Sequence, residues 1–155
     1  RDDPDAQAVL VMIYTGMRPG EFTTIKKDNV YLEERYMIGG IKTAAGKDRI
    51  IPIHEGIVPF VAQMMQCSGN AWLFGSGCYH VYLRSSYNIV KKKVGFIYTP
   101  HSCRHTFATL AKLAGMNEYA RKKIMGHSCN DLTDDVYTHA PIAYLVKQVN
   151  LIKTP

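Results

Sequence analysis

The sequence predicts a mixed α+β domain that is mainly helical and contains one small antiparallel β-hairpin. Most of the chain repeats apolar residues at helical spacing, in segments that stop at a glycine. One stretch, residues 36–53, instead has β-branched runs on both sides of a turn that contains glycine, which is typical of a hairpin. With 155 residues, 46% of them apolar, the chain can build one sizeable core. We therefore expect residues 1–155 to form a single domain.

The first half of the chain is expected to place three helices around the hairpin. Residues 2–17 open with an aspartate and a proline suited to a cap and first turn, and they end near a glycine. Residues 18–30 form a shorter helix, again with a proline near its start. Residues 55–67 are helical in spite of Pro59, and residues 71–74 are a short apolar link or an edge strand.

The second half is expected to be helical throughout. Its amphipathic segments are residues 79–95, which are basic, and residues 99–116, 117–127 and 142–152. Gly115 suits a C-terminal cap. The last segment places its apolar residues at helical spacing, where they can complete the core of this chain: Ile142, Leu145, Val146, Val149 and Ile152.

Positive charge is concentrated in the middle of the chain. Residues 36–127 hold twelve Lys and Arg against three Asp and Glu, a net charge of +9, while residues 1–35 carry −2 and residues 128–155 carry −1. One continuous positive region favours a polyanionic partner, such as nucleic acid or a membrane surface. The alternative is a basic surface that is simply solvated.

Two absences in the sequence narrow the class of protein. The longest apolar run, AVLVMIYTGM, is too short to span a bilayer, and in the sequence given no basic n-region with a cleavage site precedes it. The four cysteines form no CxxC pair and show no structural zinc spacing. We therefore expect a cytoplasmic protein with reduced thiols and no membrane partner.

Residues 99–116 carry an unusual start for an apolar helix. His101, Arg104 and His105 lie in its first turns, where cations oppose the helix dipole, so we expect an anion there. The zinc-protease pattern requires glutamate where Ser102 follows the first histidine, so no metal site is expected. His101 and Arg104 together suit a phosphodiester, because a guanidinium binds two phosphate oxygens and an imidazole transfers a proton. Taken singly, each is better explained as a core histidine or a salt-bridged arginine.

Further residues that could bind or attack a phosphate lie outside residues 99–116. Arg18 lies between two glycines at an expected helix junction, where a tight turn can present its side chain into a cleft. Glu21 either holds the orientation of Arg18 or forms an ordinary structural salt bridge with it. His127 directly follows a short helix, and Tyr137, ten residues later, suggests by itself only half-buried packing.

Five motifs in order resemble the catalytic domain of the tyrosine recombinase (phage integrase) family: TGMRPGE, IKTAAGKDRIIPI, TPHSCRHTFAT, IMGHS and VYTH. The resemblance covers residues Asp5 to Ile152 and is greatest to integrases of phages and conjugative elements of Gram-positive bacteria. It implies the catalytic-domain fold of that family and a site-specific recombinase that integrates a mobile element. By the same analogy, N-terminal core-binding and arm-binding domains are absent from this chain.

The resemblance assigns roles in binding the scissile phosphate. Arg18 and Arg104 match the two arginines that grip this phosphate. His127 matches the late histidine or tryptophan that hydrogen-bonds it. His101 matches the histidine that assists proton transfer.

The resemblance also implies the chemistry of strand cleavage. Tyr137 matches the nucleophile, which forms a 3′-phosphotyrosine and leaves a free 5′ hydroxyl for rejoining. Lys42 matches the lysine that protonates the leaving 5′ oxygen. Lys47, near the same turn, is the alternative candidate for this lysine. The covalent intermediate conserves the bond energy, so we expect no metal, nucleotide or other cofactor.

Double-stranded DNA is the partner that the resemblance implies. Arg84 and Lys91, seven residues apart, share roughly one face of an expected helix and would neutralise backbone phosphates, unless they serve only solubility. A homotetramer on DNA built from monomers in solution, exchange of the 142–152 helix between protomers, and a directionality factor are further expectations. A type IB topoisomerase, with the same fold and site, and a non-catalytic DNA-binding module are the two alternatives.

Overall fold

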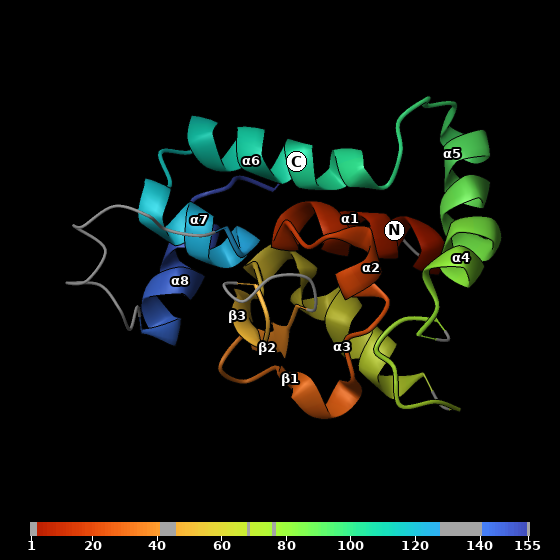
Figure 1. Ribbon diagram of the computed structural model, residues 1–155, viewed down its shortest axis with the longest axis horizontal. Coiled ribbons are helices and arrows are strands. Elements are labelled where there is room, and N and C mark those ends of the chain that lie inside the picture. Colours follow the sequence, from red (N-terminus) through yellow and green to blue (C-terminus); the bar gives the residue numbers. More distant parts are fainter. Residues whose placement is uncertain (1–2, 41–45, 68, 76, 128–140, 155) are drawn as a thin grey trace.

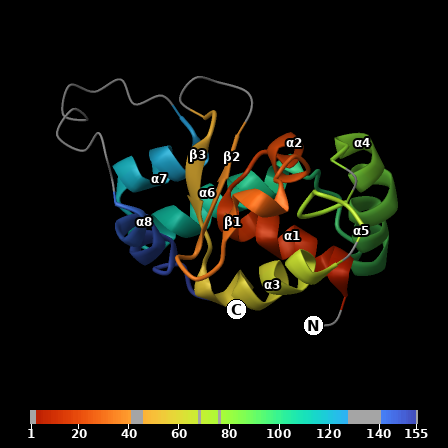
Figure 2. The same cartoon turned by 90° about the horizontal axis from the view of Figure 1, so that it is seen from below.

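The computed structural model describes residues 3–40, 46–67, 69–75, 77–127 and 141–154. Helices surround a small antiparallel sheet (Figures 1 and 2), which confirms the predicted class. The α-helices are α1 (Pro4–Thr15), α2 (Pro19–Phe22), α3 (Val58–Gln66), α4 (Tyr79–Tyr82), α5 (Asn88–Val94), α6 (His101–Leu113), α7 (Glu118–Met125) and α8 (Ile142–Val149). The strands are β1 (Val30–Tyr31), β2 (Tyr36–Gly39) and β3 (Arg49–Pro52), and the short turns are η1 (Lys27–Asn29), η2 (Glu55–Ile57) and η3 (Leu83–Tyr87). No helix in these described ranges is long and apolar enough to cross a bilayer.

Helix α1 packs against α6, which lies above it in Figure 1. The Asp3 carboxylate accepts hydrogen bonds from the backbone N–H groups of Asp5 and Ala6 at 3.0 and 3.2 Å, so it caps α1 as predicted. The helix ends at Gly16, which has a left-handed conformation with φ 62°. A Cβ at Gly16 would lie 2.5 Å from the ring of Phe107 on α6. Glycine therefore permits both the turn and the close approach of α6.

The sheet contains the predicted hairpin and one additional strand. Strands β2 and β3 pair antiparallel with Met37 opposite Ile51, and β1 pairs on the other side of β2 with Val30 opposite Met37. The prediction of a helix over residues 18–30 is therefore wrong beyond Phe22, where α2 ends. The two-residue strand β1 depends on its pairing with β2, which local sequence does not specify.

The basic segment 79–95 is helical, but it is not one regular α-helix. Helices α4 and α5 are joined by η3, a π-helical turn that buries Ser86 and Tyr87. Such turns are rare and occur mostly as single bulges inside α-helices. Trp72 pairs with Lys26 in an isolated antiparallel bridge outside the three strands, so residues 71–74 are a short link and not an edge strand of the sheet.

Helix α8 packs against β3 and α7 of its own chain (Figure 2). Leu145 and Val149 of α8, and Ile152 just after the helix, belong to the buried core as the spacing predicts. Val146 is also buried, while Ile142 is only half-buried. His54 Nε2 donates a hydrogen bond to the carbonyl of Ile152 at 2.7 Å, and the Tyr14 hydroxyl donates to the carbonyl of Lys153 at 3.2 Å. These bonds hold the C-terminal segment on the domain, and exchange of α8 between protomers stays a prediction.

Candidate active site

Arg18 lies at the start of α2, directly after the turn that ends α1. Its backbone N–H donates to Glu21 Oε2 at 3.0 Å, and its Nη1 donates to Glu21 Oε1 at 2.9 Å. One carboxylate thus fixes both the backbone and the side chain of Arg18. The arginine side chain is still 21% exposed, so it can reach a ligand from the solvent side.

Glu21 is buried and is shared between two arginines. Besides its bonds to Arg18, its Oε2 accepts a hydrogen bond from Arg49 Nη2 at 2.9 Å. Burial alone would raise the pKa of Glu21, but the hydrogen bonds from Arg49 and Arg18 outweigh it and hold the pKa below its ordinary value. The carboxylate is therefore ionised at neutral pH, and both predicted roles of Glu21, orientation and salt bridge, describe the same contact.

Arg104 is buried in the first turns of α6 and braces three segments. Its Nη1 donates to the carbonyl of Gly16 at 2.7 Å, and its Nη2 donates to the carbonyl of Met125 at 2.7 Å. The same Nη2 lies 2.8 Å from His127 Nε2. Burial, and then the charge of Arg18, lower the pKa of Arg104 to about 10, so it remains a cation at neutral pH.

His127 completes the contact with Arg104. It follows α7, which ends at Gly126 in a left-handed conformation with φ 66°. Partial burial, followed by the charges of Arg104 and Arg18, lowers the pKa of His127, so the neutral ring is favoured. Because arginine can only donate, Nε2 is the acceptor in this contact, and the proton of the neutral ring is on Nδ1.

The structure brings Arg18, Arg104 and His127 into one cluster. The charges of Arg18, Arg49 and Glu21 all act on Arg104, and these four groups carry a net charge of +2. Arg18 and His127 form the solvent side of the cluster, while Arg104 lies behind them. A pair of fixed cations beside a neutral imidazole suits a bound phosphate.

The other predicted catalytic residues are not part of this cluster as the structure describes it. His101 is the first residue of α6, one turn before Arg104; it is exposed, and its ring centroid lies 5.1 Å from that of His105. Lys47 is exposed near the base of the hairpin turn. Lys42 and Tyr137 lie outside the described residues. Among the residues that are described, no group of three or more His, Cys, Asp and Glu side chains is arranged to hold a metal ion.

Arg49 is the residue of this cluster that the sequence analysis missed. It opens β3, is only 8% exposed, and contributes its charge to the surroundings of both Arg104 and His127. The one signal in the sequence is an arginine directly before the apolar run IIPI, where a strand would be expected to turn its side chains into the core.

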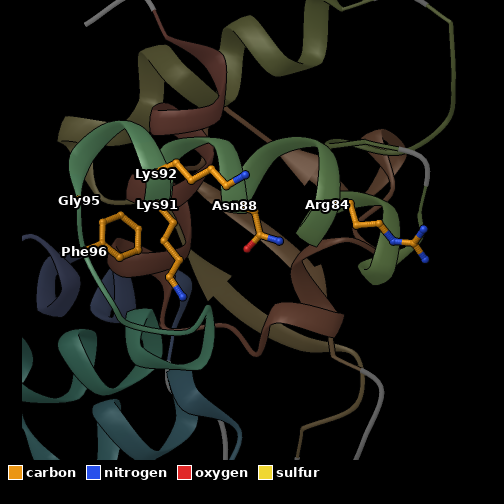
Figure 3. Close-up of a pocket in the computed structure, with 6 residues that line it drawn as sticks. All are labelled: Arg84, Asn88, Lys91, Lys92, Gly95 and Phe96. Carbon is orange, nitrogen blue, oxygen red and sulfur yellow. The ribbon is translucent and has the colours of Figure 1, made fainter.

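A basic groove lies on the η3–α5 segment (Figure 3). It has a volume of about 490 Å³ and is lined by Arg84, Asn88, Lys91, Lys92, Gly95 and Phe96. The two predicted DNA-binding residues, Arg84 and Lys91, therefore line the same hollow even though the π-helical turn alters the helical spacing. Asn88 and Lys92 are further polar groups that the sequence analysis did not select.

The helical fold with its small antiparallel sheet and the cluster of arginines beside a histidine can now be compared with known proteins. The phage integrase family matches residues 2–142, and the chain belongs to this family. It is 28% identical to the tyrosine recombinase XerA of Pyrococcus horikoshii over 94% of this chain and 55% of that protein, and 29% identical to the transposase of transposon Tn916 from Enterococcus faecalis over 85% and 41%.

A solved structure gives the same result for the fold. The Tn1549 transposon integrase, in complex with circular intermediate DNA, superposes with a TM-score of 0.67 at 25% identity over 91% of this chain and 55% of that chain. These similarities confirm the predicted family and the predicted likeness to integrases of phages and conjugative elements. The chain spans about half the length of the curated relatives it matches.

Proposed function

We propose that this chain is the catalytic domain of a site-specific recombinase that cuts and rejoins double-stranded DNA through a 3′-phosphotyrosine on Tyr137. The observation that carries the proposal is the cluster of Arg18, Arg104 and His127, joined by the 2.8 Å contact between Arg104 Nη2 and His127 Nε2. Membership of the phage integrase family supports the same chemistry.

The cluster fits the charge that develops during cleavage. Attack by a tyrosine oxygen on a phosphodiester adds negative charge to the non-bridging oxygens. Arg18 and Arg104 are held in place before substrate arrives, and losing one such donor costs on the order of 3 kcal/mol in comparable oxyanion sites. In the proposed complex with DNA, His127 donates its one ring proton, the proton on Nδ1, to a phosphate oxygen.

Proton transfers complete the proposed reaction. The phenol of Tyr137, with an ordinary pKa of about 10, gives up its proton as it attacks, and the neighbouring arginines favour the phenolate. His101 assists this transfer from the first turn of α6. Lys42, or its rival Lys47, protonates the departing 5′ oxygen. Rejoining runs the same steps in reverse, so neither a nucleotide nor a metal is required.

DNA binding is assigned to the basic groove. Arg84 and Lys91 would neutralise backbone phosphates, which gives affinity that depends on salt and carries no sequence information. We further propose that the protein acts in the cytoplasm on a mobile element, as a monomer in solution and a homotetramer on DNA. Site-specific binding and control of direction would come from additional domains and a directionality factor.

A nicked suicide substrate tests the proposal. The protein, extended to full length, is incubated with nicked attachment-site DNA and run on a denaturing gel beside the variants Tyr137→Phe and Tyr98→Phe. Tyr98 is a matched control because its side chain is 64% exposed and it belongs to none of the five motifs. We expect a covalent band that Tyr137→Phe abolishes and Tyr98→Phe retains.

Two outcomes would contradict the proposal. A band that survives Tyr137→Phe would mean that another residue is the nucleophile. A protein that binds DNA without forming any band would be a non-catalytic binding module. Exchange of strands between two DNA sites separates a recombinase from a type IB topoisomerase, which only relaxes supercoils.

A further inference from the structure

Arg49 connects three segments of the molecule from a buried position on β3. Its Nε donates to the carbonyl of Ile124 at 2.8 Å, its Nη1 to the carbonyl of Gly46 at 2.9 Å, and its Nη2 to Glu21 Oε2 at 2.9 Å. These acceptors belong to α7, to the base of the hairpin turn and to α2. Every nitrogen of the guanidinium therefore has a fixed partner within the protein.

Two of these segments carry the phosphate-binding groups. Ile124 lies in the last turn of α7, next to Met125, whose carbonyl binds Arg104, and three residues before His127. Glu21 holds the backbone and side chain of Arg18. Arg49 thus bonds to segments on both sides of the phosphate site, through Glu21 on one side and the carbonyl of Ile124 on the other. Its own donors are taken up by these protein acceptors and do not bind the phosphate directly.

The surrounding backbone leaves room for this side chain. A Cβ at Gly40, where φ is 109°, would lie 2.4 Å from Arg49 Nη1. A Cβ at Gly126, where φ is 66°, would lie 3.0 Å from Arg49 Cδ and 2.9 Å from the Cα of Gly46. Glycine at both places allows the hairpin and the end of α7 to close around the guanidinium.

Packing alone does not explain an arginine at this place. Burying a charge is costly, and well-packed apolar residues often replace a buried ion pair without loss of stability. The other inward-facing residues of β3 and its continuation, Ile51 and Ile53, are apolar and fully buried. What the arginine adds is a set of directional bonds that fix α2 relative to α7.

We propose that Arg49 is a positioning residue of the recombinase site. By holding Glu21 and the end of α7 in one arrangement, it sets the spacing between Arg18 on one side of the scissile phosphate and Arg104 with His127 on the other. The inference rests on the proposed function, because it concerns the geometry of the same phosphate site.

The test compares Arg49→Gln and Arg49→Lys with Arg35→Gln. Arg35 is a matched control because its 4.0 Å contact with Glu55 is solvent-exposed. For each full-length variant, three quantities are measured: the unfolding temperature, the affinity for DNA, and the first-order rate of covalent complex formation at saturating DNA. The rate is measured on an ordinary scissile phosphate and on a methylphosphonate, in which a methyl group replaces one non-bridging oxygen and the linkage carries no charge.

We expect Arg49→Gln to slow cleavage of the phosphate about 100-fold, the effect typical of a misplacement of about 1 Å, with DNA affinity nearly unchanged. On the methylphosphonate the loss should shrink to less than about 10-fold, because less developing charge has to be met by correctly spaced cations. Arg49→Lys keeps the charge but cannot fill three acceptor positions, so it should fall between Arg49→Gln and the wild type. Arg35→Gln should match the wild type.

Three results would overturn the inference. Equal losses on both substrates, or losses that follow the fall in unfolding temperature, would show that Arg49 acts only on stability. Wild-type cleavage by Arg49→Gln would show that the site needs no such brace. If Arg49→Gln does not fold, Arg49→Lys decides by the same comparison of substrates. A wild-type protein that cleaves neither substrate would instead refute the proposed function, and this inference with it.

Discussion

Arg104 and Arg18 should respond differently to truncation, although both are assigned to phosphate binding. Arg104→Ala removes a guanidinium that is only 4% exposed and leaves the carbonyls of Gly16 and Met125 without their donor. An unpaired buried polar group costs about 1–3 kcal/mol, so the two carbonyls together cost about 2–6 kcal/mol of unfolding free energy. That is a large part of the roughly 5–15 kcal/mol by which domains are stable.

Arg18→Ala is the matched comparison. Its side chain is partly exposed, and its partner Glu21 keeps the buried ion pair with Arg49. We expect Arg18→Ala to lower the free energy of unfolding by about 1–3 kcal/mol, half of the loss for Arg104→Ala, because it leaves one buried acceptor, Glu21 Oε1, without its donor instead of two. Both variants should lose at least about 100-fold in cleavage rate, because each removes one fixed donor from the phosphate.

Urea unfolding followed by circular dichroism measures the first quantity, and covalent complex formation on a suicide substrate measures the second. The expected pattern is a similar loss of cleavage with clearly unequal losses of stability. Equal stability of the two variants would refute the conclusion that Arg104 braces α6 against α1 and α7. If either variant cleaved DNA at the wild-type rate, the substituted arginine would not bind the scissile phosphate.

Backbone geometry, a buried histidine and the basic groove give three further expectations. Gly16→Ala and Gly115→Ala both place alanine at positive φ, which costs about 1–2 kcal/mol each, but only at Gly16 would the new Cβ lie 2.5 Å from an aromatic ring. Thermal unfolding should therefore show a greater loss of stability for Gly16→Ala. Equal losses of stability would contradict the close approach of α6 to Gly16. Burial lowers the pKa of His54 below its ordinary 6.5, so the stability that the neutral ring contributes is complete above pH 6.5 and is lost as the pH falls through the lowered pKa. In urea unfolding at several pH values, His54→Gln should reduce the fall in unfolding free energy below pH 6.5. An unchanged dependence on pH would contradict this role of His54. Arg84→Gln and Lys91→Gln should each reduce the slope of log affinity against log salt concentration by about 1, without altering the preference for DNA sequence. An unchanged slope would show that the substituted residue does not contact a DNA phosphate.

Local signals were sufficient to predict much of the fold. Asp3 and Gly16 mark the ends of α1, because a cap and a left-handed terminus are encoded by a few neighbouring residues. The β-branched runs on both sides of a glycine-containing turn in residues 36–53 predicted the β2–β3 hairpin for the same reason. Strand β1 and the π-helical turn were not predicted: β1 has only two residues, too few to show a strand pattern, and the turn interrupts a segment whose apolar spacing is that of an ordinary helix.

The candidate site shows the same limit. Arg18, Arg104 and His127 belong to sequence motifs, and the structure brings them together. Arg49 was missed because its role comes from Glu21 and Ile124, which are 28 and 75 residues away in the sequence. The apolar run that follows Arg49 indicates a buried strand, but nothing in that run shows which acceptors the guanidinium reaches.

The most direct measurement is the site of covalent attachment to DNA. The full-length protein is trapped on a nicked substrate, digested with protease and nuclease, and analysed by mass spectrometry for a peptide that carries a nucleotide. The account predicts a single adduct, a 3′-linked nucleotide on the peptide that contains Tyr137. An adduct on any other residue, or cleaved DNA with no adduct at all, would contradict it.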